Sequence, residues 1–171
     1  MTRRTTELVV PVADLLPHPG ARKTVQREAI VDGLAVSGSR VPDGATVRLD
    51  LELQAINDAI VAVGEVHAPW AGECRRCLKA ITGDVVAHVQ EIYEREPVEG
   101  ETRLLANNEV DLTEMARDVV LLELPLAPLC DDDCLGLCPT CGVDRNTTSC
   151  ACEQEAPDPR WAALSQLEFD E

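Results

Sequence analysis

The sequence of 171 residues has few aromatic side chains, almost no lysine and no long apolar run. Its aromatic residues are Trp70, Tyr93, Trp161 and Phe169. A core must therefore be aliphatic, and the hydrophobic content of 45% is enough to build one in a chain of this length. No segment approaches the roughly 18 apolar residues of a membrane-spanning helix, and no secretory signal is visible. We expect a cytoplasmic protein without a membrane partner.

The sequence also lacks the motifs of the common catalytic and cofactor sites. There is no G-x-S-x-G nucleophile elbow, no P-loop and no glycine motif for a dinucleotide. Acidic neighbours such as Asp131–Asp133 stand without a placed base or nucleophile. We therefore predict that the protein is not an enzyme and has no small-molecule substrate.

Positive charge is scarce in the second half of the chain, and the formal net charge is -16. Residues 1–90 carry 10 basic and 11 acidic side chains, whereas residues 91–171 carry 5 basic and 20 acidic ones. The second half would repel a phosphate backbone, so any contact with RNA is expected in the first half. The acidic half suits either simple solubility or a basic protein partner, and ribosomal proteins are the obvious basic class.

Cysteine, in contrast, is abundant, with eight residues in two places. Six lie between Cys130 and Cys152, and the other two are Cys74 and Cys77. In a reducing compartment this number of thiols favours metal binding over disulfides. A disulfide framework is the alternative, and the absence of a visible secretory signal argues against it.

The segment Cys138-Pro-Thr-Cys141-Gly142 has the pattern of a zinc knuckle, in which two thiolates bind one metal around a tight turn. Cys150 and Cys152 would complete the set after an eight-residue spacer. Four thiolates at about 2.3 Å form a closed, structural site that leaves no position for water. Because this polar loop has no core of its own, zinc would supply its folding free energy, about 10–16 kcal/mol in small zinc peptides.

The remaining cysteines are Cys74, Cys77, Cys130 and Cys134. If sequence neighbours stay together, the four pairs divide into two sites in three ways. We favour one zinc held by these four and a second held by the knuckle set, because the knuckle set is local. The alternative for Cys74 and Cys77 is a redox dithiol. Such motifs normally open a helix after a strand, whereas this one joins two predicted strands.

The apolar pattern predicts an α+β fold, a small antiparallel β-sheet or barrel with one main helix and a C-terminal zinc-knuckle segment. Residues 1–24 are expected to be irregular, and residues 25–129 to form the β-domain. The clearest period-2 alternation is that of the apolar residues at 47, 49, 51 and 53. Strands are predicted at 25–36, 47–53, 60–68 and 80–93, with a turn at Asn57 and Asp58.

A helix is predicted near 111–124, where Asp111 and Glu114 have capping-box spacing. Its apolar stripe consists of Leu112, Met115, Ala116, Val119 and Leu122. Residues 130–171 are expected to form the cysteine-rich segment, with a short terminal helix beginning near Pro159. The histidines, expected to be ordinary structural or surface residues, are His18, His67 and His88.

Two small basic clusters are the candidate RNA contacts. The first consists of Arg22, Lys23 and Arg27, and the alternative for it is a solvated loop. The second consists of Arg75, Arg76 and Lys79, within and beside the first cysteine pair. A knuckle would hold these side chains at a fixed angle for phosphate contacts. The alternative is that they balance the charge of -2 on a zinc bound by four thiolates.

The order of these motifs resembles the YceD family, also called large ribosomal RNA subunit accumulation proteins. Four segments carry the resemblance: E-C-R-R-C-L, P-L-x-P-L-C-x3-C, G-L-C-P-x-C-G-x-D-x-N and the closing D-P-R-W-A. Together they cover the chain from about residue 25 to 170. Relatives that lack the knuckle but keep the first pair, with His or Cys at the positions of Cys130 and Cys134, imply the same division of the thiols.

The resemblance implies a non-enzymatic factor in large ribosomal subunit biogenesis that supports the accumulation or processing of 23S rRNA. Its partner would be an rRNA precursor, a basic ribosomal protein, or both, and its cofactors two structural zinc ions, each bound by four cysteines. The competing functions are a zinc-dependent interaction module that chaperones a basic ribosomal protein, and a thiol redox protein.

Overall fold

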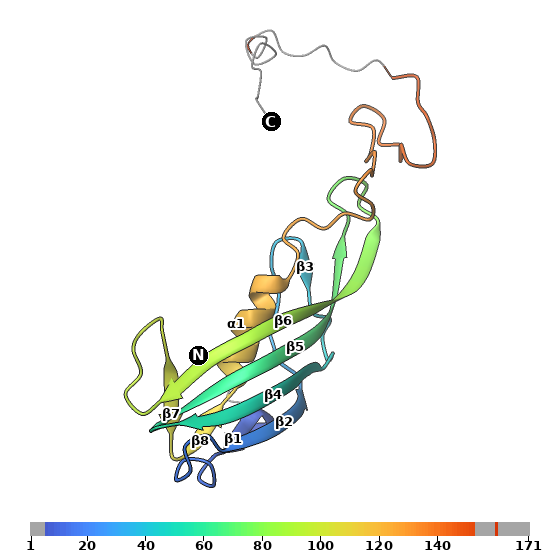
Figure 1. Cartoon of the computed structure of the whole chain (residues 1–171). Helices are drawn as coiled ribbons and strands as arrows, with labels where there is room; N and C mark the ends of the chain where they lie inside the picture. Colours follow the sequence, from blue (N-terminus) through green and yellow to red (C-terminus); the bar gives the residue numbers. More distant parts are fainter. Residues whose placement is uncertain (1–5, 153–159, 161–171) are drawn as a thin grey trace.

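The computed structural model describes residues 6–152 and Arg160, so the predicted terminal helix lies outside the described residues. The described part is mostly β-sheet with one helix (Figure 1), which broadly confirms the α+β class. The elements in chain order are η1 Thr6–Leu8, β1 Val9–Pro11, β2 Arg22–Ala29, β3 Ser39–Arg40, β4 Val47–Ile56, β5 Ala59–Glu73, β6 Ala80–Glu94, β7 Arg103–Ala106, β8 Glu109–Asp111 and α1 Thr113–Glu123.

The strands form one curved sheet in the order β1-β8-β7-β6-β5-β4-β2, with β3 paired to β5. All neighbours are antiparallel except β6 and β7, where Tyr93 pairs with Arg103 in parallel. The four predicted strands pair antiparallel as expected, and the parallel pair involves β7, which was not predicted. The loop 95–102 carries the chain back, so that β7 starts beside the end of β6 instead of returning as a hairpin.

The period-2 pattern of β4 is confirmed. Its side chains alternate between buried and exposed along the whole strand, and Leu49 and Leu53 are fully buried. The predicted turn to β5 is also present, with Asn57 in the left-handed region at a φ of 48°. Asn tolerates this conformation better than most residues, because its short polar side chain can bond the local backbone.

The first 24 residues are more ordered than expected. Val10 lies in β1, which pairs with β8, and Leu8, Val10 and Val12 are fully buried in the core. β2 begins at Arg22, inside the segment expected to be irregular, and ends at Ala29 instead of residue 36. The prolines in this segment led to the expectation of irregular structure. Pro11 is nevertheless compatible with β1, because β1 lies at the edge of the sheet.

Helix α1 lies within the predicted range, but it begins later than expected. Asp111 belongs to β8, and Leu112 is the N-cap residue, although Asp111 Oδ1 still accepts a hydrogen bond from the Thr113 N–H. The predicted stripe is wrong at its end, since Leu122 is 84% exposed and Val120 is buried instead. The packing of α1 on β6 and β5 decides which side faces the core.

The hairpin of β5 and β6 extends beyond β4, and only the short strand β3 pairs with its far part (Figure 1). The last partner of β5 on β4 is at His67, and β5 then continues to Glu73, which is about 20 Å further at the usual rise of a strand. This tip carries Cys74 and Cys77 to the segment that follows α1. Within residues 6–152, no helix combines the length and apolar character needed to cross a bilayer.

Candidate metal centres

The turn between β5 and β6 has the hydrogen bonding of a zinc knuckle. The Cys74 N–H donates to the carbonyl of Lys79 at 2.8 Å, and the Leu78 N–H donates to the carbonyl of Cys74 at 2.9 Å. These bonds bring Cys74 and Cys77 onto one side of the turn. Leu78 has a φ of 60°, a conformation that costs a residue other than glycine about 1–2 kcal/mol.

The segment from Cys138 to Val143 forms the same turn. The Cys138 N–H donates to the carbonyl of Val143 at 2.8 Å, and the Gly142 N–H donates to the carbonyl of Cys138 at 2.8 Å. Gly142, with a φ of 74°, occupies the position that Leu78 has in the first knuckle. The described residues therefore contain two copies of one turn, and only the second has a glycine at the position of positive φ.

The first group of thiols, called tetrad 1, consists of Cys74, Cys77, Cys130 and Cys134. Their Sγ atoms all lie within 4.8 Å of one another. The distance is 3.8 Å between Cys74 and Cys134 and 3.5 Å between Cys77 and Cys130. A tetrahedron with zinc–sulfur bonds of about 2.3 Å has edges of about 3.8 Å, whereas a disulfide measures about 2.05 Å. The donor set of tetrad 1 therefore fits one zinc.

The segment after α1 is fixed against the loop around β3, and this contact places the second half of tetrad 1. Ser39 Oγ donates to the carbonyl of Pro125 at 2.9 Å, and Ser37 Oγ donates to that of Leu126 at 3.3 Å. The Arg75 N–H donates to the carbonyl of Pro128 at 2.9 Å. Tetrad 1 thus closes the seam between the β5–β6 tip and the chain that leaves the helix.

The second group, called tetrad 2, consists of Cys138, Cys141, Cys150 and Cys152, whose Sγ atoms also lie within 4.8 Å of one another. The two tetrads are the groups into which the sequence analysis divided the thiols. Their surroundings differ, because Cys74 is fully buried in tetrad 1, whereas Cys141 and Cys150 are exposed. Four thiols at this spacing again fit a closed tetrahedral zinc site.

The two tetrads touch through Asn146, which lies between Cys141 and Cys150 in sequence. Its Nδ2 donates to Cys134 Sγ at 3.4 Å, and its Oδ1 accepts from the Leu135 N–H at 2.7 Å. Asn146 therefore belongs to the loop of tetrad 2 but contacts a thiol of tetrad 1. Sequence reasoning missed it, although the last position of the G-L-C-P-x-C-G-x-D-x-N motif marked this residue.

Backbone N–H groups favour the thiolate form of the first cysteine in each knuckle. The pKa of Cys74 is lowered to about 6, chiefly because the backbone N–H of Cys77 donates to its sulfur. The pKa of Cys138 is also lowered to about 6, chiefly by the backbone N–H of Cys141. Each tetrad therefore presents one preformed thiolate to an incoming cation.

Other thiols hold their protons more strongly. The pKa of Cys130 is raised to about 12, chiefly because its sulfur is hydrogen-bonded to that of Cys77. The pKa of Cys152 is raised to about 12, chiefly by its hydrogen bond with Cys141. A zinc ion would have to displace these protons, since thiols bind metals as thiolates.

Zinc binding to the metal-free protein at pH 7 is expected to release fewer than four protons per zinc. A thiol with a pKa of about 6 is already roughly nine-tenths ionised at pH 7, so Cys74 and Cys138 have little proton left to lose. Because protons compete with zinc, affinity should fall with decreasing pH, and more steeply below about pH 6, where these two thiols become protonated. Calorimetry in buffers of different ionisation enthalpy counts the protons. A release of four per zinc would contradict the prediction.

The alternative of a redox dithiol finds little support in the geometry. Cys74 and Cys77 lie in a turn between strands, not at the start of a helix, and their exposed fractions are 0% and 8%. A thiol must be accessible to exchange with a substrate disulfide. Among the described residues, both cysteines are also grouped with two further thiols instead of standing as an isolated pair.

The three histidines lie outside both tetrads. His67 Nε2 is 3.4 Å from Glu65 Oε2, and His88 Nδ1 is 3.6 Å from Glu65 Oε1, in a polar network on the surface of the sheet. His18 is exposed in the loop between β1 and β2. Among the described residues, thiols alone make up the two candidate metal sites.

The first basic cluster lies on β2, far from the thiols. Arg22 forms an ion pair with Glu52 at 3.2 Å, and Lys23 forms one with Asp14 at 3.2 Å. Arg27 is exposed, and its Nη1 donates to the carbonyl of the preceding residue at 2.9 Å. Two of the three cations are therefore already paired with carboxylates of the chain.

The second basic cluster lies at tetrad 1, but its members differ in role. Arg76 Nη1 donates to the carbonyls of Asp132 and Cys134, at 2.9 Å each, and so holds the loop between the two later thiols of tetrad 1. Arg75 and Lys79 form no ion pair within the described part of the chain. The structure brings this cluster and the β2 cluster to different parts of the molecule (Figure 1).

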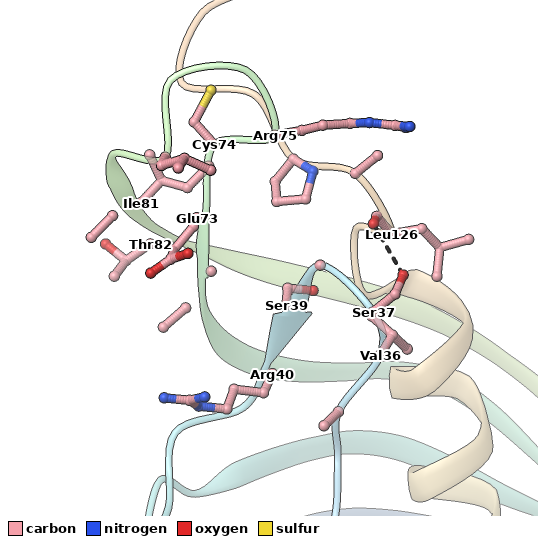
Figure 2. A pocket seen from close by; sticks show the side chains of 18 residues that line it. Val36, Ser37, Ser39, Arg40, Glu73, Cys74, Arg75, Ile81, Thr82 and Leu126 are labelled. Carbon is pink, nitrogen blue, oxygen red and sulfur yellow. Dashed lines mark hydrogen bonds between the residues drawn. The ribbon is translucent and has the colours of Figure 1, made fainter. Parts of the chain in front are cut away.

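A groove of about 740 Å³ lies beside tetrad 1, between the loop around β3 and the ends of β5 and β6. Figure 2 shows Cys74 at its margin, with Arg40 and Arg75 on opposite sides of it. Arg40 also forms no ion pair with the described residues. Sequence reasoning missed Arg40, because only the pairing of β3 with β5, which sets Arg40 beside Ala71, brings it to the groove.

Comparison of the sequence with known proteins identifies relatives of this chain. The family model for the large ribosomal RNA subunit accumulation protein YceD matches residues 62–168. An uncharacterized protein of Mycobacterium tuberculosis is 33% identical over 94% of this chain and 81% of its own length. One of Mycobacterium leprae is 34% identical over 98% of this chain and 84% of its own.

The similarity extends to a plant protein over a shorter stretch. The large ribosomal RNA subunit accumulation protein YCED homolog 1, chloroplastic, of Arabidopsis thaliana is 36% identical over 34% of this chain and 18% of its own length. No solved structure matches the chain.

Proposed function

The chain belongs to the YceD family, whose name implies a role in the accumulation of large-subunit ribosomal RNA, and from this premise we propose that it is a non-enzymatic factor in the assembly of the large ribosomal subunit. It would act in the cytoplasm and support the accumulation or processing of 23S rRNA by binding RNA or a ribosomal protein. The thiols would serve to hold the fold, since neither tetrad offers an open position for chemistry.

Two zinc ions would be structural parts of this factor. Cys74, Cys77, Cys130 and Cys134 would hold the first, and Cys138, Cys141, Cys150 and Cys152 the second. The support is the closeness of four thiols in each group, within 4.8 Å of one another. In tetrad 1 the two measured spacings, 3.8 and 3.5 Å, are also near the edge of a zinc–thiolate tetrahedron. The metal would supply the stability that the small polar C-terminal segment cannot obtain from a core.

The observation that carries the RNA-binding proposal is the groove at tetrad 1 with Arg40 and Arg75 on its two sides. Guanidinium groups bind phosphate oxygens in a bidentate manner, and neither group is neutralised by a carboxylate of the described chain. The groove walls are held by the Ser39–Pro125 contact and by the knuckle, so the cations would meet RNA at fixed positions. Lys79 would add a further phosphate contact.

Replacing both Arg40 and Arg75 by glutamate is expected to reduce co-sedimentation with large-subunit precursors at least about tenfold. Each change removes a cation that would bind phosphate and adds a repulsive charge. The affinity should also depend less on salt, with a logarithmic slope smaller by about one unit for each cation removed. Gradient centrifugation of extracts that contain the tagged protein, followed by quantitative detection across the fractions, measures the effect.

The matched control is the pair Arg22→Glu and Arg27→Glu on β2, which changes the net charge by the same amount at the other basic cluster. This control is expected to leave co-sedimentation within about twofold of the wild type. Because both variants change the net charge equally, any loss seen with the control measures the unspecific effect of charge. If the β2 pair instead abolished the association while the groove pair did not, the RNA contact would lie on β2. Arg76 is unsuitable for such a test because it also holds the loop of tetrad 1.

A second candidate function is the chaperoning of a basic ribosomal protein by the acidic half of the chain. The supporting observation is the loop between β6 and β7, where Glu96, Glu99 and Glu101 are accompanied by a single basic residue, Arg95. Arg95 itself donates to Asn108 Oδ1 at 2.8 Å. Affinity purification before and after nuclease treatment separates the two candidates. A ribosomal protein that stays bound after RNA is digested would favour the chaperone, and its loss would favour RNA binding.

A further inference from the structure

The side chain of Asn146 makes contacts that the turn in which it lies does not need. The turn is closed without it, since the Thr148 N–H donates to the carbonyl of Asp144 at 3.0 Å. The amide nitrogen of Asn146 donates within the turn, to Asp144 Oδ1 at 2.6 Å, but it also reaches the other tetrad, where it donates to Cys134 Sγ at 3.4 Å. Its amide oxygen accepts from the Leu135 N–H. The contacts with Cys134 and Leu135 fall on the loop that carries the last thiol of tetrad 1.

Backbone contacts support this bridge from both sides. The Arg145 N–H donates to the carbonyl of Gly136 at 2.9 Å, and the Leu137 N–H donates to the carbonyl of Arg76 at 3.0 Å. Gly136 has a φ of 71°, and a Cβ there would lie 3.0 Å from the Arg76 carbonyl oxygen, so the two loops approach closely. The loop of tetrad 2 therefore packs on the first knuckle as well as on Cys134.

We propose that Asn146 is a positioning residue that couples metal binding at the two tetrads. Metal at tetrad 2 fixes the loop from Cys141 to Cys150, and this loop holds the Asn146 amide against Cys134. The amide donates to the sulfur and so orients it for binding the metal of tetrad 1. Groups that hydrogen-bond to metal ligands in this way commonly change metal affinity by about 10–100-fold. The inference rests on the zinc-binding part of the proposed function, but not on any contact with RNA.

Through this coupling, metal bound at the exposed tetrad 2 would strengthen metal binding at the more buried tetrad 1. Cys141 and Cys150 are exposed, so tetrad 2 is open to chelators and solvent, whereas Cys74 is fully buried. Coupling free energies are reciprocal, so a filled tetrad 2 raises the affinity of tetrad 1 by the same factor that a filled tetrad 1 raises that of tetrad 2. Metal should therefore leave tetrad 2 first when zinc is scarce, and its loss should loosen tetrad 1.

The test measures zinc affinity directly, by competition with a chromophoric chelator on the full-length protein. Cys150→Ser disables tetrad 2, so the zinc that this variant still binds can be assigned to tetrad 1. Asn146→Ala is expected to weaken zinc binding at tetrad 1 about tenfold. Asn146→Asp should weaken it more, because it keeps an acceptor for the Leu135 N–H but turns an oxygen toward both the sulfur and the Asp144 carboxylate. Thr147→Ala is the matched control, since Thr147 Oγ1 bonds only within its own turn, to the carbonyl of Asp144 at 3.2 Å.

A double-mutant cycle decides whether Asn146 carries the coupling. Cys150→Ser alone is expected to weaken tetrad 1 about tenfold, and adding Asn146→Ala to it should cost less than about threefold more, because the loop is already released. Additive effects of the two changes, or an Asn146→Ala variant with the affinity of the wild type, would overturn the inference while leaving the zinc sites in place. A wild-type protein that binds no zinc would remove the inference and the zinc proposal together.

Discussion

Replacing Cys74 by serine is expected to lower the melting temperature of the zinc-loaded protein by at least about 10 °C, whereas Cys138→Ser should lower it by only a few degrees. Cys74 is fully buried, and its tetrad joins the β5–β6 tip to the segment after α1. A structural zinc contributes many kcal/mol to folding, and one kcal/mol corresponds to about 2–4 °C in a domain of this size. Losing this site should therefore weaken the sheet as well as the knuckle.

Cys138 belongs to the site that holds mainly its own loop. Its removal should release residues 138–152 from their turn but leave the sheet folded, apart from the loss of the Asn146 contact with Cys134. Calorimetric melting, together with elemental analysis of the bound metal, checks both variants, and each should retain one zinc where the wild type has two. Equal losses of stability in the two variants would contradict the idea that tetrad 1 stabilises the β-sheet whereas tetrad 2 stabilises only its own loop. A wild type with one zinc would contradict the two tetrads.

Gly38→Ala is expected to lower the free energy of unfolding by about 2–3 kcal/mol and to weaken metal binding at tetrad 1. A Cβ at Gly38 would lie 2.7 Å from the carbonyl carbon of Leu126 and 2.7 Å from Cδ of Pro128, closer than a Cβ atom approaches non-bonded atoms in folded proteins. The neighbours are backbone and ring atoms, so the segment itself must move, and overpacking of this kind typically costs about 1–3 kcal/mol. The same segment leads to Cys130, so the metal site should move with it.

Gly44→Ala is the matched control for this prediction. Gly44 has a φ of 77° but no atom within 4 Å of an added Cβ, so only the backbone conformation is penalised, by about 1–2 kcal/mol. Denaturant unfolding should show a moderate loss for Gly44→Ala with unchanged zinc affinity. If Gly38→Ala left the zinc affinity of tetrad 1 at the wild-type value, the contact between the β3 loop and residues 125–128 would not position the metal site.

Several features of the fold could be predicted because they are local in sequence. The alternation of β4 follows from the period of a strand, and helix α1 was predicted within two residues at its start and one at its end. The predicted boundaries failed where pairing partners decide them. Val10 is buried because β1 pairs with β8, about a hundred residues later, and no property of the first 24 residues indicates that partner.

The candidate site shows the same division. The two C-x-x-C pairs and their grouping with later thiols could be inferred, because each pair needs a tight turn and four thiolates need one another. The groove could not, because Arg40 reaches it only through the pairing of β3 with β5. Arg76 was predicted as an RNA contact, and the structure adds a role that the sequence did not indicate: its guanidinium donates to the carbonyls of Asp132 and Cys134. Arg76 and Cys134 are 58 positions apart in sequence, so no local pattern indicates that they are in contact.

Residue types and short spacings were enough to predict an aliphatic core, eight thiols in four pairs, and a second half with 20 acidic and 5 basic side chains. These properties depend on residue identity and on spacings of a few positions. The tertiary structure alone decided which cations remain unpaired, which loop holds Cys134, and that Asn146 touches both tetrads. The physical reason is that hydrogen bonds such as Ser39 to Pro125 join residues 86 positions apart, and only the folded sheet brings such pairs within bonding distance.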